Sequence, residues 1–172
     1  MDCWNAEHYY DPTAAAAIRR VMARETENAD EDAVRGILFR PEELGLEIAR
    51  RRTRAEALRR FATRLTAAPR EVTVTSTPDP SRSQDLLAEA MDEEAQIPQL
   101  EEERSRALTE AGLLISRLPD PRLIRLLELR YLEGTGWDSI ARTLGYAAGS
   151  VFRFHRHALA RLAEILREDR GG

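Results

Sequence analysis

The sequence is poor in the residues that build several common classes of protein. It has one cysteine, Cys3, no lysine among its 26 basic residues, and only 6% aromatic residues in 172 positions. A single cysteine excludes an internal disulfide, which agrees with a reducing compartment. No run approaches the roughly 18 consecutive apolar residues of a membrane span, and the polar N-terminus lacks the pattern of a secretory signal. We therefore expect a cytoplasmic protein with no membrane contact.

The residue patterns of enzymes and metal proteins are missing as well. We find no nucleophile beside a base, no paired carboxylates in a polar pocket, and no glycine-rich phosphate loop. His155 and His157 lie about 200° apart on a helix, so they cannot chelate one ion together, and Cys3 and His8 lack a second ligand pair. The sequence predicts a protein that is not an enzyme and has no catalytic residues, metal or cofactor.

Charge is abundant but unevenly distributed. The formal net charge is -4, yet residues 40–70 hold nine arginines against four acids and residues 119–172 hold nine against seven. Residues 1–39 and 81–118 are acidic, with four arginines each against eight and nine acids. An acidic total therefore does not argue against nucleic acid, because the positive charge is concentrated in two segments.

With 33% charged residues and few aromatics, the composition predicts an all-α fold. In residues 1–39, Asp11 and Pro12 would begin a short helix over residues 14–24, followed by an acidic linker at residues 28–32. A new helix would begin at Pro41.

From Pro41, apolar residues recur at alternating spacings of four and three, which indicates a helix with a coiled-coil-like seam. Arg51 occupies the one polar position of a seam that includes Leu44, Ile48, Ala55, Leu58, Ala62 and Leu65. The exposed face is rich in arginine, and its candidate nucleic-acid contacts are Arg50, Arg52, Arg54 and Arg59. Solvation with ion pairs, or contact with nucleic acid or an acidic partner, would each explain this face.

Residues 67–82 combine prolines with a Thr/Ser run and predict a flexible loop. The alternation of Val72 and Val74 leaves a short edge strand as the alternative. A second long helix is expected from about Gln84 to Arg117, with Pro98 kinking it. Its acidic clusters complement the arginine-rich helix, so residues 40–118 predict a long antiparallel helical hairpin. The alternative is pairing between chains, which would make a homodimer through the helical arm.

Residues 119–172 predict a separate tri-helical module. Pro121 suits the first turn of a helix that ends before Gly134 and Gly136. A second helix has one apolar face, made by Trp137, Ile140, Ala141 and Leu144, and Gly145 stands where a left-handed backbone is expected. The third helix would begin near Gly149.

The third helix has a clear division into two faces. Val151, Phe154, His155, Ala158 and Leu162 lie in one arc, and no acid occurs from Gly145 to Arg161. An acid-free helix face with arginines suits the anionic major groove. The candidate DNA contacts are Gly149, Ser150, Phe152, Arg153, Arg156 and His157. For Phe152, packing and contact with a thymine methyl or a partner both remain open.

The string LLELRYLEGTGWDSIARTLGY at residues 126–146, with Val151, His155, Ala158 and Leu162 after it, resembles region 4 of bacterial sigma factors. It is still more similar to sigma-like late-gene regulators of phages and prophages, of the ArpU and RinA type. The match covers about residues 118–166. The resemblance implies a helix-turn-helix in which residues 137–144 support a recognition helix from Gly149 to Leu166. Where relatives place Ser or Thr at the start of that helix, this chain has Ala147, Ala148 and Gly149, which leaves fewer polar atoms to read bases.

We therefore expect a phage or prophage transcription regulator that binds double-stranded DNA and acts with RNA polymerase. One alternative is a DNA-packaging adaptor of the small terminase kind, which also joins a helix-turn-helix to a helical arm. Another is a protein-interaction module with a vestigial helix-turn-helix.

Overall fold

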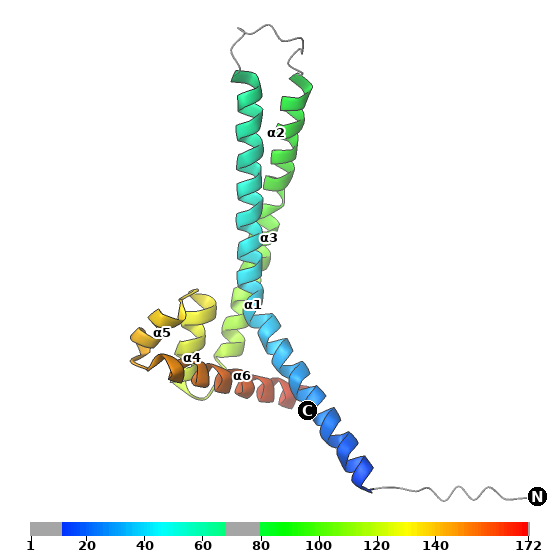
Figure 1. The fold of residues 1–172 in the computed structure, drawn as a ribbon, viewed down its shortest axis with the longest axis vertical. Coiled ribbons are helices and arrows are strands. Elements are labelled where there is room, and N and C mark those ends of the chain that lie inside the picture. The colour runs from blue at the N-terminus through cyan, green and yellow to red at the C-terminus, as the bar shows by residue number, and fades with distance from the viewer. Residues whose placement is uncertain (1–11, 68–79, 172) are drawn as a thin grey trace, which may run out of the picture.

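The computed structural model describes residues 12–67 and 80–171, and every regular element in these ranges is a helix, as the all-α prediction requires. Figure 1 shows a long arm of α1, α2 and α3, with α4, α5 and α6 gathered at its base. The elements in order are α1 (Pro12–Ala67), α2 (Pro80–Ala95), α3 (Ile97–Ile115), α4 (Pro121–Leu127), the π-helical turn η1 (Glu128–Leu132), α5 (Trp137–Leu144) and α6 (Ala148–Gly171).

The first helix is much longer than the sequence analysis predicts. One continuous α1 runs through the expected linker at residues 28–32 and through Pro41, so the prediction of a short helix, a linker and a new start is wrong. Proline inside a helix removes one backbone hydrogen bond and crowds the preceding turn, which bends the helix. Figure 1 shows α1 changing direction between its two halves. Because the side chain of Pro41 is fully buried, packing holds the bend in place.

The acidic segment is helical because a distant part of the chain neutralises it. Asp30 is only 1% exposed, and its carboxylate accepts hydrogen bonds from Arg167 Nε at 3.1 Å and Arg170 Nη1 at 2.8 Å. Arg35 pairs with Glu31 one turn earlier at 3.4 Å. A buried carboxylate needs such partners, and here they come from the end of α6, which local sequence patterns do not reveal.

In the arm, α2 and α3 pack along α1 and run back in the opposite direction (Figure 1). The buried side chains between the helices include Leu44, Ile48, Ala55, Ala62, Ala90 and Ala107. The hydroxyl of Ser83 donates to the carbonyl of Ala62 at 3.4 Å, which marks the register of α1 against α2. Leu65, which is expected in the seam of the first helix, is 43% exposed.

The part of the arm that runs back along α1 consists of two helices, α2 and α3, which are separated at Gln96. Pro98 lies in the first turn of α3, where its missing N–H costs no helical hydrogen bond. Instead of the predicted kink within one helix, the helix is interrupted just before this proline. The helices also extend into the predicted loop, since Ala67 and residues 80–82 are helical. The rest of that loop, with Val72 and Val74, lies outside the described residues.

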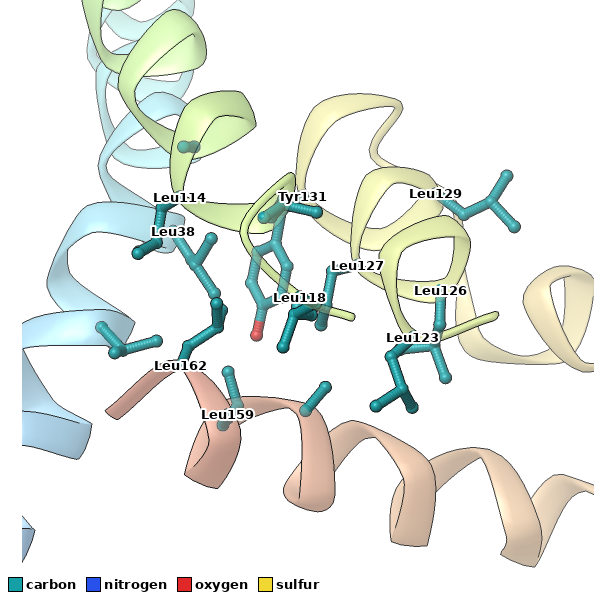
Figure 2. Packing of buried hydrophobic residues seen from close by; sticks show 14 of the residues in the cluster. Leu38, Leu114, Leu118, Leu123, Leu126, Leu127, Leu129, Tyr131, Leu159 and Leu162 are labelled. Atoms are coloured by element: carbon teal, nitrogen blue, oxygen red, sulfur yellow. The ribbon is translucent and has the colours of Figure 1, made fainter. Parts of the chain in front are cut away.

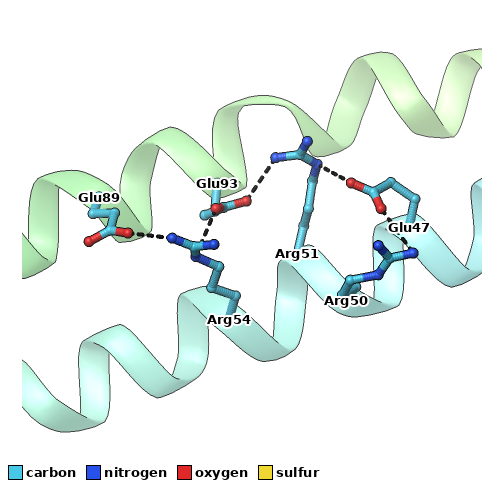
Figure 3. A network of polar contacts seen from close by, with 6 residues as sticks. All are labelled: Glu47, Arg50, Arg51, Arg54, Glu89 and Glu93. Carbon is cyan, nitrogen blue, oxygen red and sulfur yellow. Dashed lines mark hydrogen bonds and ion pairs between the residues drawn. The ribbon is translucent and has the colours of Figure 1, made fainter.

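Ion pairs run along one side of the arm (Figure 3). Arg51, the polar residue of the seam, lies 2.8 Å from Glu93 on α2 and 3.0 Å from Glu47 on its own helix. Arg54 contacts Glu89 at 2.6 Å and Glu93 at 3.0 Å. The half-buried Arg51 is therefore ion-paired with two carboxylates, although its buried Nε makes no hydrogen bond, and the network joins α1 to α2.

The largest hydrophobic core lies where the arm meets the C-terminal helices (Figure 2). It combines Leu38 of α1, Leu114 of α3, Leu126 of α4, Tyr131 of η1 and Leu162 of α6, all buried. Arm and base therefore share one core, and the orientation of α6 is set by the helices of the arm.

The contact between Asp30 and the end of α6 predicts a measurable stability difference. Asp30→Ala removes two hydrogen bonds to charged groups, so the free energy of unfolding in a urea titration should fall by about 1.5–3 kcal/mol. The matched control is Asp32→Ala, since Asp32 is exposed and 3.8 Å from Arg35. Its effect should stay within about 0.5 kcal/mol. If the two variants lost the same free energy of unfolding, the buried contacts of Asp30 would stabilise the fold no more than an exposed ion pair does.

Candidate nucleic-acid interface

The C-terminal helices begin at a well-defined cap. The Asp120 carboxylate accepts from the backbone N–H of Arg122 at 2.9 Å, and Pro121 fills the first turn of α4, as predicted. The hydrogen bond from the Arg122 side chain also lowers the pKa of Asp120, which keeps the cap ionised. The predicted helix to Leu132 continues as η1, and Gly134 follows with a φ of +67°. A left-handed backbone there favours glycine.

A tight turn joins α5 to α6. Gly145 has a φ of +68°, and the N–H of Tyr146 bonds to the carbonyl of Ala141 at 2.9 Å, which closes the end of α5. Helix ends of this kind use glycine because other residues are strained at positive φ. The predicted left-handed position at Gly145 is confirmed, and α6 begins at Ala148, one residue before the predicted start.

The two faces of α6 separate as the sequence predicts. Val151, Ala158 and Leu162 are buried against the base, and Phe154 and His155 are half-buried. Five of the six candidate DNA-contact residues are exposed, and Ser150 is half-buried. The exposed residues are Gly149, Phe152, Arg153, Arg156 and His157. The structure thus brings the candidates together on the outward face of the first half of α6.

The two arginines on this face are not paired with an acid in the described part of the chain. Among the described residues, neither Arg153 nor Arg156 has a carboxylate within ion-pair distance, although most other arginines of the chain do. The Arg153 guanidinium lies 5.6 Å from the ring centre of Phe154. The two side chains remain available to an anion such as a phosphate or to the acceptor edge of guanine.

Phe152 both packs against the protein and keeps an exposed side, so it can serve both roles that the sequence leaves open: packing and contact with a ligand. Its ring centre lies 5.0 Å from that of Trp137, the first residue of α5, and 48% of its surface is exposed. Trp137 itself is half-buried and also contacts His155, with ring centres 4.9 Å apart. Phe152 is therefore held in place by Trp137 on its inner side, while its outer side is exposed and can contact a ligand.

His155 is a packing residue, as the sequence suggests. Its Nε2 lies 2.8 Å from the hydroxyl of Tyr131 on η1. Burial, followed by the positive charges of Arg130 and Arg35, lowers the pKa of His155 to about 4, and burial also raises the pKa of Tyr131. The imidazole is thus neutral at pH 7, and it joins α6 to η1 through an uncharged hydrogen bond.

Arg130 is a structural residue that the sequence analysis does not identify. Its guanidinium carbon lies 5.2 Å from the Trp137 ring centre and 5.9 Å from that of Tyr131, and Nη2 is 3.8 Å from Glu42 on α1. Cation–π contacts of this kind stabilise a guanidinium between aromatic rings. No motif in the sequence marks Arg130, and the folded chain places this residue of η1 beside Trp137.

The candidate basic face of α1 is committed to ion pairs within the chain. Arg54 and Arg59 bond to Glu89 and Glu94, and these hydrogen bonds raise the pKa of both guanidiniums. The other two candidates, Arg50 and Arg52, contact Glu47 and Glu101. These four arginines therefore make the ion pairs that the sequence analysis gave as one of its two explanations.

In the part of the chain that the structure describes, no group of His, Cys, Asp and Glu is placed to hold a metal ion. None of the helices in the same part is long and apolar enough to cross a membrane. Comparison with known proteins adds no relative, because no family model, curated protein or solved structure matches the chain.

The buried imidazole predicts a pH dependence of stability. His155 has a pKa of about 4 in the folded chain and 6.5 in the unfolded chain. Between these two pH values the unfolded chain therefore binds more protons than the folded chain. The free energy of unfolding should therefore fall as the pH is lowered from about 6.5 toward about 4. Urea titrations across this range would measure the fall.

The matched variants are His155→Gln and His157→Gln. Glutamine at 155 removes the titrating group, so this part of the pH dependence should disappear, whereas glutamine at the exposed position 157 should leave it in place. An unchanged slope in His155→Gln would contradict the assignment.

Proposed function

We propose that the chain is a DNA-binding transcription regulator whose α4, α5 and α6 form a helix-turn-helix, with α6 as the recognition helix. The observation that carries the proposal is the outward face of α6. It presents Arg153 and Arg156 without a carboxylate partner among the described residues, in a stretch that has no acid from Gly145 to Arg161. The major groove of B-DNA is about 12 Å wide and admits one helix. Phosphates flank the groove, and hydrogen-bond acceptors of the bases line its floor.

The way α6 is held supports the same proposal. Val151 and Leu162 anchor its inner side in the shared core, and Arg167 and Arg170 tie its end to Asp30 on α1. A helix fixed at both ends loses little conformational freedom on binding, so more of the interaction with DNA appears as affinity. The outward side chains of the first half of the helix, Arg153 and Arg156, take no part in these contacts.

Arg153, Arg156 and Phe152 would divide the work of binding. Arginine recognises phosphate or the O6 and N7 atoms of guanine, and an exposed phenyl ring suits a thymine methyl group. Since Gly149 and Ala147 offer no side-chain donors, we expect phosphate contacts to dominate the affinity and base contacts to be few.

The assignment to transcription depends on the resemblance of residues 118–166 to region 4 of sigma factors and to sigma-like phage regulators. In such a regulator the base docks on promoter DNA while the arm of α1, α2 and α3 reaches RNA polymerase. The arm would suit this role because it projects away from the base (Figure 1).

A second candidate is a DNA-packaging adaptor of the small terminase kind, which works as a ring. The observation that favours it is the opposite sign of the exposed charges on the two helices of the arm: Arg60 and Arg64 on α1, and Asp85 and Asp92 on α2, have no ion-pair partner among the described residues. Run-off transcription separates the two candidates: a regulator changes the output of a promoter near its own gene, and a packaging adaptor does not.

DNA binding can be measured directly by fluorescence anisotropy at several salt concentrations. We expect Arg153→Ala with Arg156→Ala to abolish measurable binding at physiological salt. Each arginine replaced singly should weaken binding and lower the slope of log affinity against log salt by about 1, because one phosphate contact is lost.

The matched control is Arg106→Ala on α3, which removes an exposed arginine that contacts Glu102 far from α6. Its affinity for DNA should equal that of the unchanged chain. Full binding by the double α6 variant would overturn the proposed interface and favour a pure interaction module.

A further inference from the structure

The side of α1 that faces away from α2 and α3 is partly apolar and has no covering element in the described part of the chain. Leu46 and Phe61 are 62% and 57% exposed, and a shallow groove beside Leu46 includes Ala49 and Ala57. We call this the α1 outer face and define it by Leu46, Ala49, Ala57, Arg60, Phe61 and Arg64. The buried residues Ile48, Ala55 and Ala62 lie on the opposite side of the same helix.

A second uncovered face lies on the other side of the arm. Met91 is 63% exposed and Leu87 is 38% exposed, while Ala90 between them is fully buried against α1. We call this the α2 outer face and define it by Asp85, Leu87, Ala88, Met91, Asp92 and Ala95, all of which are exposed. Because α1 and α2 meet through their buried sides, the two outer faces point in opposite directions.

The free charges on the two faces have opposite signs. Arg60 and Arg64 have no carboxylate partner among the described residues, and Asp85 and Asp92 have no arginine partner there, whereas Arg51, Arg54 and Arg59 are all paired. Each face would repel a copy of itself and attract the other. This favours contact between unlike faces over a two-fold dimer through either face alone.

The register of the arm puts two positions of the α1 outer face level with two positions of the α2 outer face. Ser83 lies against Ala62, so equal steps along the antiparallel helices put Arg60 level with Asp85 and Ala57 level with Ala88. A second copy displaced sideways, without sliding along the arm, would keep these levels. Arginine would then meet aspartate, and alanine would meet alanine where two helices must approach closely.

We propose that the chain assembles head to tail through its arm, with the α1 outer face of one copy on the α2 outer face of the next. Such a contact joins unlike surfaces, so it generates a ring if the rotation closes and a filament if it does not. The proposal goes beyond DNA binding and is independent of it, because neither face includes a residue of α6.

Charge reversal tests the contact, with the mass in solution measured by light scattering. The unchanged chain should assemble beyond two copies. Arg60→Glu with Arg64→Glu, and separately Asp85→Arg with Asp92→Arg, should each reduce the mass to that of a single chain. An equimolar mixture of the two variants should recover assembly, because each then meets its complement in the other.

Glu110→Arg is the control, since it reverses an exposed charge on α3 and should leave the mass unchanged. Helix content by circular dichroism and DNA binding should stay the same in all variants, which separates loss of assembly from loss of folding. The proposal is overturned by a monomeric unchanged chain, by charge variants that assemble normally, by a mixture that stays monomeric, or by a dimer that never grows.

Discussion

The packing of α6 against α1 is the contact on which the rest of the structure depends. Val34 and Leu38 of α1 share one core with Leu159 and Leu162 of α6, and Asp30 holds Arg167 and Arg170 at its edge. Without this contact the N-terminal half of α1 would be an isolated charged helix, and such helices are marginal in water. With it, the arm and the proposed recognition helix form a single body (Figure 2).

Arginine has three distinct uses in this chain, and the local surroundings decide between them. Arg54 and Arg59 join the helices of the arm through carboxylates, and Arg130 stacks on aromatic rings inside the base. Arg153 and Arg60 have no such partner in the described residues and are the ones to which we assign DNA and a second copy. Since exposed ion pairs contribute little each, the arginines without partners tell more about function than those with them.

The proposed site was easier to predict than the first third of the fold. The faces of α6 follow from helical period alone, so the exposure of Arg153 and Arg156 and the burial of Val151 were predictable. The helix through residues 28–32 was not, because Asp30 is stabilised by residues more than a hundred positions away. The ion pairs of Arg54 and Arg59 were foreseen only as one of two explanations, since pairing depends on the register of α1 against α2.

By itself, the sequence determined the all-α class, the left-handed turn at Gly145 and the two faces of α6, because each depends on intervals of a few residues along the chain. Only the tertiary structure decided that α1 is continuous through Pro41, that Arg130 lies over Trp137, and that Arg60 of α1 is level with Asp85 of α2. These features join segments far apart in sequence, and they depend on burial and charge pairing that no local pattern encodes.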